Sequence, residues 1–172
     1  MKLPALSAAI VLCAAGFATA DDDYPVSVKS LPQALTAAVQ QYLPGAEIIS
    51  AKSDEDDGRQ TFELVVDYKV LVLRVEARPD GRIREIDMDR GYKGVGSVLG
   101  REASLARVGV DRVAQPARNT VAEFFPGSKI ISASEGEERG RTFYRLRARH
   151  GDLVLRIDAG ADGRVLDIDT EK

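Results

Sequence analysis

Arginine residues recur at every second position in one segment of the C-terminal half. Arg145, Arg147 and Arg149 follow Phe143 at this spacing, and Arg156 lies in the next apolar segment. Successive side chains of a strand point to opposite faces, so this spacing places the aromatic ring and the guanidinium groups on one face of a sheet. A guanidinium group binds a carboxylate through two parallel hydrogen bonds. The pattern therefore predicts a binding site for an acidic protein surface or a carboxylate ligand.

Aspartate residues in the same half have part of the spacing of a calcium-binding loop. Asp158, Asp162, Gly163 and Asp169 occupy the first, fifth, sixth and twelfth positions of an EF-hand loop. The third ligand position is Gly160, and the flanking segments are typical of strands rather than helices. A hairpin turn also accounts for the Asp-Gly pair without a metal ion. Metal binding by the three aspartates is therefore an alternative to the arginine site.

Few residues suggest catalysis. The only histidine is His150, at the end of a predicted strand, where a solvent-exposed turn residue is expected rather than a general base. No Ser-His-Asp order, Gly-x-Ser-x-Gly motif or phosphate-binding glycine loop stands out. No carboxylate lies in an apolar stretch that would raise its pKa. We therefore expect a protein that is not an enzyme and that uses no cofactor.

The arginine-containing half is a second copy of the half before it. With a shift of 82 positions, residues 44–87 align with residues 126–169 without a gap, and 20 of the 44 pairs are identical. The longest identical runs begin at Ile48 and at Leu71 of the first copy. Agreement of this extent indicates a duplication, which decides the architecture before any single motif does.

Each copy is predicted to form one helix followed by four strands. In the first copy Pro32 suits the first helical turn, apolar residues then recur at helical spacing, and Pro44-Gly45 ends the helix. The strands that follow have short connections, which favour an antiparallel meander. The expected fold is α+β, with two tandem repeats that each pack one helix on a four-stranded antiparallel meander sheet. The predicted strands of the first copy are Ala46–Ser53, Gln60–Asp67, Val70–Glu76 and Ile83–Met88.

The two copies differ in charge on the sheet face that the helix leaves open. Glu63 and Asp67 of the first copy align with Arg145 and Arg149 of the second. Two explanations without a binding site remain open. The charges can form solvated faces that discourage aggregation, or the acidic face of one copy can meet the basic face of the other.

The first residues of the chain predict an export signal. Lys2 precedes an apolar run that ends in Ala18-Thr19-Ala20, the small-x-small pattern that signal peptidase cleaves. Cys13 lies within this run and follows Leu12, which does not fit lipoprotein processing. We expect cleavage near Ala20, a periplasmic or secreted location, and a remaining chain without disulfides or a transmembrane anchor.

The rest of the chain is mildly acidic. After removal of the signal it holds 23 basic and 27 acidic residues, whereas a nucleic-acid-binding domain is usually strongly basic. The expected organisation comprises a signal peptide, an N-terminal extension, a first repeat, a glycine-containing linker with a short helix over Glu102–Arg107, and a second repeat. These segments are residues 1–20, 21–30, 31–89, 90–112 and 113–172.

The repeated unit resembles the PepSY-like family of exported bacterial domains. The residues that carry the resemblance are Leu31-Pro32, Tyr42–Ile48, Gly58-Arg59, Phe62-Glu63 and Asp80–Ile83 in the first copy, and Phe125–Ile130 and Ala161–Val165 in the second. They match a helix, a Pro-Gly-Ala-x-Ile motif and a meander, and the two copies cover most of the chain. The resemblance implies a periplasmic or secreted, non-enzymatic protein, and it transfers no catalytic residue.

PepSY domains occur in protease propeptides, where an inhibitory role has been proposed, and β-lactamase inhibitor proteins look like a tandem of this unit. Inhibitor surfaces are rich in aromatic anchors, whereas this chain has no Trp and only Phe143 is expected to point outward. We predict a binding module of the cell envelope whose partner is another exported protein, with inhibition of a protease or other exported enzyme as a specific form. The alternative is a binder or sensor of a small ligand or a cation such as calcium.

Overall fold

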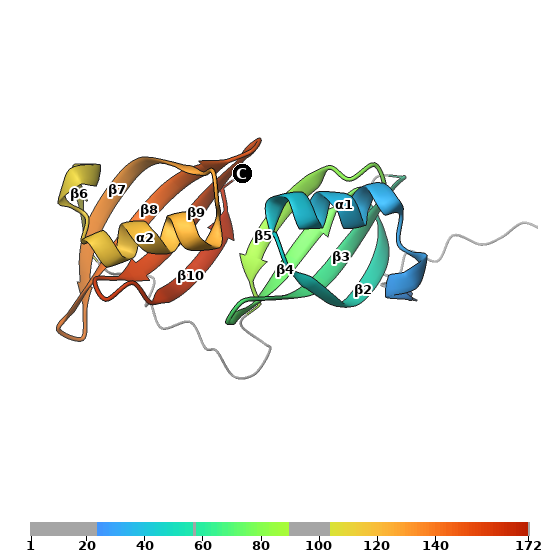
Figure 1. The fold of residues 1–172 in the computed structure, drawn as a ribbon, viewed down its shortest axis with the longest axis horizontal. Helices are drawn as coiled ribbons and strands as arrows, with labels where there is room; N and C mark the ends of the chain where they lie inside the picture. The colour runs from blue at the N-terminus through green and yellow to red at the C-terminus, as the bar shows by residue number, and fades with distance from the viewer. Residues whose placement is uncertain (1–23, 57, 90–103, 172) are drawn as a thin grey trace, which may run out of the picture.

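A computed structural model describes residues 24–56, 58–89 and 104–171. These residues form two five-stranded antiparallel sheets, each with one α-helix against one face (Figure 1). The expected α+β fold with four-stranded meanders is therefore wrong, because each sheet has a fifth strand and 55% of the described residues lie in strands. The expected signal peptide, residues 1–20, and the glycine-containing part of the expected linker, residues 91–100, lie outside the described residues.

The two units have the same elements in the same order. The first unit contains β1 (Tyr24–Val26), the 3-10 helix η1 (Val28–Ser30), α1 (Gln33–Tyr42), β2 (Glu47–Asp56), β3 (Arg59–Tyr68), β4 (Leu71–Ala77) and β5 (Ile83–Met88). The second unit contains β6 (Leu105–Val108), η2 (Val110–Arg112), α2 (Gln115–Phe124), β7 (Lys129–Glu138), β8 (Arg141–His150), β9 (Leu153–Gly160) and β10 (Val165–Thr170). This repetition echoes the duplication of the sequence.

The additional strand of each sheet precedes the helix and pairs with the strand that follows it. In the first unit Val26 of β1 lies opposite Ala51 of β2, and in the second unit Leu105 of β6 lies opposite Gly136 of β7. The short helix expected over Glu102–Arg107 is therefore wrong where the chain is described, since Leu105 begins a strand. Segments this short show little alternation of apolar and polar residues, which is the signal that predicts a strand.

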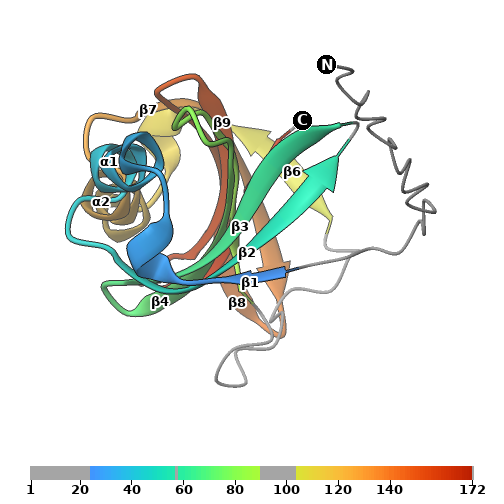
Figure 2. The same ribbon diagram turned by 90° about the vertical axis from the view of Figure 1, so that its right-hand side faces the viewer.

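Each helix covers one face of its own sheet through a small apolar stripe. Leu35 and Val39 of α1 and Ala117 of α2 have no exposed surface, and Val121 of α2 is 2% exposed. Burying one such Leu or Val side chain contributes about 1.5–3 kcal/mol to stability. The buried side chains of the two units belong to one continuous apolar cluster. The opposite face of each sheet, here called the open face, carries no helix (Figure 2).

The two units meet where β5 of the first sheet and β10 of the second lie side by side (Figure 1). Thr170 joins them, because its Oγ1 accepts the N–H of Ile86 at 2.8 Å and donates to the carbonyl of Ile86 at 3.1 Å. The N–H of Thr170 donates to Oδ1 of Asp87 at 2.9 Å. These bonds satisfy backbone groups of two neighbouring edge strands without merging them into one ladder.

A second set of contacts joins the C-terminal ends of the two helices. His150 is only 6% exposed and makes edge-on ring contacts with Tyr42, at 5.3 Å between centroids, and Phe125, at 5.4 Å. The expectation that His150 is a solvent-exposed turn residue is therefore wrong, because the other unit covers the hairpin end in which it lies. Tyr42 also donates a hydrogen bond from its hydroxyl to Asp152 in the turn that follows.

Candidate functional site

The arginine cluster lies on the open face of the second unit, but its members are bound to acidic partners. Nε and Nη2 of Arg145 donate to the two carboxylate oxygens of Asp158, each at 2.8 Å. Asp158 is 1% exposed, so this is a buried bidentate pair on adjacent strands. The hydrogen bonds that Arg145 donates to Asp158 raise the pKa of Arg145. Arg145 therefore compensates a buried charge instead of presenting a free guanidinium group.

Two further arginines of the cluster are paired in the same way. Arg147 donates to Glu171 at 2.6 Å, and Arg156 donates to Asp169. Arg149 is exposed, and no hydrogen bond or ion pair joins its side chain to another described residue. The explanation in which the basic face meets the acidic face of the other copy is wrong, since these partners lie in the second unit.

Phe143 lies on the same face of β8 as the alternating arginines, but its side chain does not project into solvent. It is 2% exposed, so the expected aromatic anchor is wrong. The reason is its register, because Phe143 lies opposite Gly136 on β7 and opposite Gly160 on β9. A Cβ atom at Gly136 would lie 2.7 Å from Cζ of Phe143 and 2.9 Å from Cδ2 of Leu105. The ring therefore packs over the glycine backbone toward Leu105.

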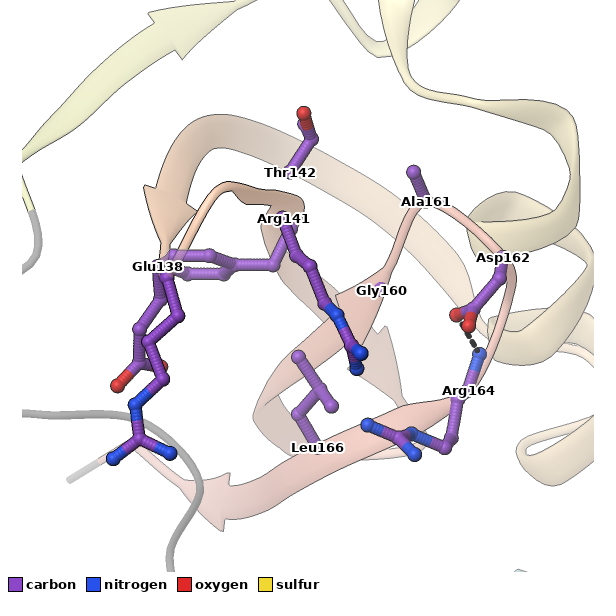
Figure 3. A pocket seen from close by; sticks show the side chains of 10 residues that line it. Glu138, Arg141, Thr142, Gly160, Ala161, Asp162, Arg164 and Leu166 are labelled. Carbon is purple, nitrogen blue, oxygen red and sulfur yellow. Dashed lines mark hydrogen bonds between the residues drawn. The ribbon is translucent and has the colours of Figure 1, made fainter.

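A cavity of about 510 Å³ opens on the same face, and Phe143 is among its lining residues. Figure 3 shows the side chains that surround it. Phe143, Gly160 and Leu166 form its apolar floor, and Leu166 is 8% exposed. The carboxylate of Asp162 lies beside Gly160, because a Cβ atom there would be 2.5 Å from Oδ1 of Asp162. The remaining lining residues come from the β7–β8 hairpin and the β9–β10 turn, and they are Glu138, Arg139, Arg141, Thr142, Ala161, Asp162 and Arg164.

Two arginines outside the predicted cluster dominate the rim of this cavity. Arg141 begins β8 and Arg164 follows the β9–β10 turn, and their guanidinium groups extend over Leu166 toward each other (Figure 3). In the described part of the chain no carboxylate pairs with either side chain. Asp162 instead accepts the backbone N–H of Arg164 at 3.0 Å, which fixes the turn. The cavity thus combines an apolar floor with two cationic groups that have no ionic partner among the described residues.

The cavity is a property of the second unit. Its floor is built from Phe143, Gly160 and Leu166, and the first unit has polar or charged residues at all three positions. The equivalent residues of the first unit are Thr61, Arg78 and Arg84. The rim arginines, in contrast, are shared, since Arg141 and Arg164 are identical in the two copies. A comparison of the copies at their differing positions would have found this site, whereas alternation along one strand could not.

The aspartates proposed as metal ligands have other roles in the structure. Asp158 pairs with Arg145, Asp169 pairs with Arg156, and Asp162 holds the β9–β10 turn. Across residues 24–56, 58–89 and 104–171, no group of three or more His, Cys, Asp or Glu side chains is placed to hold a metal ion.

Comparisons with known proteins identify no family. No protein-family description and no curated protein matches the chain. One similar solved structure is a candidate calcium-regulated periplasmic protein from Bacteroides thetaiotaomicron, at 19% identity and a TM-score of 0.34, covering 87% of this chain and 98% of that chain. Another is a candidate periplasmic protein of the DUF2874 family from Bacteroides vulgatus, at 20% identity and a TM-score of 0.35, with the same coverage.

A third similar structure is a candidate periplasmic protein of unknown function from Bacteroides vulgatus. It has 15% identity and a TM-score of 0.35, and the match covers 86% of this chain and 98% of that chain. At such values the likeness assigns neither a ligand nor a function to this chain. In the described part of the chain, no helix is long and apolar enough to cross a lipid bilayer.

Proposed function

We propose that this chain is an exported, non-enzymatic binding module that receives its ligand in the cavity of the second unit. The observation that carries the proposal is the cavity itself, with Phe143 and Leu166 in its floor and Arg141 and Arg164 at its rim. Ligand sites are typically concave, mostly apolar and equipped with a few convergent polar groups. The export signal predicted over residues 1–20 supports a periplasmic or secreted location.

The roles of the titratable groups support binding rather than catalysis. His150 lies between the two units and contacts Tyr42 and Phe125. Arg145 and Asp158 neutralise each other in a buried pair. A general base must reach the proton that it removes from a substrate, and these groups are already engaged with other parts of the protein.

The proposed partner is another exported protein that inserts one group into the cavity, or a small ligand that fills it. The resemblance to PepSY-like domains supports the first form, and inhibition of a protease or another exported enzyme is its more specific version. The depth of Phe143, at 2% exposed, counts against a surface of projecting aromatic anchors and favours insertion of a partner group into the cavity. A calcium sensor finds less support, since Asp158 and Asp169 are paired with arginines.

The test is affinity capture from an envelope extract of the source organism with three forms of the immobilised protein. The first form is native, and the second carries Gly160→Arg and Leu166→Arg, which give the cavity the residues of the first unit. The control carries Ala37→Arg and Ala122→Arg, which add the same charge at exposed helix positions. Capture by the native and control forms that is lost with the filled cavity supports the proposal. Equal capture by all three forms, or capture by none, contradicts it.

A further inference from the structure

We propose that the cavity of the second unit recognises an amphipathic carboxylate, which is an apolar group that carries one free carboxylate. This inference rests on the proposed function and assigns the chemistry of its ligand. The apolar group would lie against Phe143 and Leu166, which both line the cavity. The carboxylate would lie between the guanidinium groups of Arg141 and Arg164.

The residues in the floor of the cavity favour a ligand with an apolar group. The other open-face residues of β8 are arginines, namely Arg141, Arg145, Arg147 and Arg149, so Phe143 is the apolar residue on this face of the strand. Phe143, Gly160 and Leu166 line the cavity together, and Oδ1 of Asp162 lies 2.5 Å from the position that a Cβ atom of Gly160 would take. Apolar surface that leaves water on binding contributes about 25 cal/mol per Å². A small hydrophilic anion would leave this contribution unused.

The arginines at the rim of the cavity favour a ligand with a negative charge. Arg139, Arg141 and Arg164 all line the cavity, whereas the acidic lining residues are Glu138 and Asp162. Asp162 is engaged by the backbone of its own turn. On the open face of the second unit, Arg145, Arg147 and Arg156 each pair with a carboxylate. The two arginines that extend over the cavity, Arg141 and Arg164, have no such partner among the described residues. Their guanidinium N–H groups can therefore donate to a ligand.

The identity of the anion follows from the combination of floor and rim. Guanidinium groups bind carboxylate and phosphate in the same bidentate manner, but the apolar floor favours an anion that is joined to an apolar body. A cavity of about 510 Å³ lies in the range of small-molecule sites. Two sources offer this chemistry: a free carboxylic acid, and the C-terminal residue of a polypeptide whose last side chain is apolar.

The experiment is isothermal titration of the purified protein with five probes that separate charge, apolar body and source. The probes are 3-phenylpropionate, 3-phenylpropionamide, inorganic phosphate, and the peptide Gly-Ser-Gly-Leu-Phe with a free or an amidated C-terminus. We expect one or both carboxylate probes to bind. The matched amide should bind at least about tenfold more weakly, because a hydrogen bond to a charged group contributes that much more to the binding free energy. Binding of the peptide acid alone would assign the ligand to a chain terminus, and binding of phenylpropionate alone would assign it to a free acid.

The second unit and the first provide matched variants. Arg141→Ser with Arg164→Ser should weaken carboxylate binding by about tenfold or more. The control is Arg59→Ser with Arg82→Ser, which changes the equivalent exposed pair of the first unit. This variant should bind the carboxylate with unchanged affinity. The two double variants should have the same melting temperature. If the first does not fold, the comparison of the acid with the amide on the native protein still tests whether the ligand is a carboxylate.

Three results would overturn the inference: binding of acid and amide with equal affinity, binding of phosphate alone, or no binding by any probe. If envelope capture depends on the cavity while no carboxylate binds, the ligand chemistry is wrong and the proposed function stands. If capture is also independent of the cavity, both are wrong.

Discussion

Tyr68 and His150 occupy equivalent positions of the two units, and each binds a carbonyl group at the end of the other unit's helix. The hydroxyl of Tyr68 donates to the carbonyl of Phe124 at 2.8 Å, and Nε2 of His150 lies 2.9 Å from the carbonyl of Tyr42, to which it donates. Tyr42 and Phe124 are themselves equivalent in the duplicated sequence. The interface is therefore reciprocal, as between two copies of one molecule. The final carbonyls of a helix lack partners within that helix, and here each unit satisfies those of the other.

The first prediction concerns Tyr68→Phe. The change removes the donor to the Phe124 carbonyl without creating a large cavity, and a buried carbonyl left unsatisfied costs about 1–3 kcal/mol. We expect the free energy of unfolding, measured by urea denaturation, to fall by about that amount. Val70→Ala, in the adjacent turn where the side chain is 86% exposed, serves as the control and should have little effect. Equal stability of the Tyr68 variant and the native protein would show that this bond does not hold the interface.

The second prediction concerns the close approach of the turn after β8 to Tyr42. Gly151 has a φ of +62°, and a Cβ atom there would lie 2.7 Å from the hydroxyl of Tyr42. Gly151→Ala should therefore cost the strain of a positive φ, about 1 kcal/mol, and in addition displace the Tyr42 ring. Gly140→Ala is the matched control, because Gly140 has a φ of +73° and nothing within 4 Å of its Cβ position. We expect the Gly151 variant to melt at the lower temperature, and identical melting temperatures would contradict the contact.

The sequence predicted the longer elements of each unit well and the short strand that precedes each helix poorly. The strand expected over Ile83–Met88 has the observed bounds, and α1 begins just after Pro32. These elements are long enough for periodicity and turn residues to mark them. β1 and β6, with three and four residues, are too short for that signal. They exist because β2 and β7 offer an unpaired edge in the folded sheet, which is information from tertiary structure.

Of the five residues predicted to bind a partner, only Phe143 lines the cavity, which lies on the same open face. Alternation placed Arg145 and Phe143 on the open face, yet it carries no information about what lies on the neighbouring strand. Asp158 neutralises the arginine and Gly136 gives space to the ring, and both effects depend on cross-strand register. His150 was misplaced for a related reason, because only the packing of the two units covers it.

The third prediction concerns the buried pair of Arg145 and Asp158. Arg145→Ala leaves the carboxylate of Asp158, 1% exposed, without its counter-charge; because the Arg145 side chain is itself 33% exposed, we expect a cost of about 1–3 kcal/mol. Arg149→Ala removes a neighbouring arginine of the same strand that is exposed, so it should change the free energy of unfolding by less than about 1 kcal/mol. Urea denaturation of the two variants provides the comparison. If both lose the same small amount, the Arg145 pair contributes no more than a surface ion pair.

The fourth prediction concerns the pH dependence of the seam between β5 and β10. Burial raises the pKa of Asp87 to about 7, together with the hydrogen bond that its protonated form donates to Glu85 and the charges of Glu85 and Asp169, against the opposing effect of the Thr170 N–H. The pKa of this side chain in the unfolded chain is about 3.8. A carboxyl group with a raised pKa in the folded state contributes its stability below the unfolded value, and that contribution is lost as the pH rises through the folded value.

The free energy of unfolding should therefore fall between about pH 4 and pH 7 through Asp87. Other carboxylates titrate in the same range, so the informative quantity is the difference between the native protein and Asp87→Asn. Asparagine keeps an oxygen that can accept the N–H of Thr170, but it does not ionise. We expect the variant to gain thermal stability relative to the native protein as the pH rises from 4 to 8. Melting curves whose difference stays constant across this range would show that Asp87 ionises as freely in the folded protein as in the unfolded chain, and that the seam between the two units is insensitive to its charge.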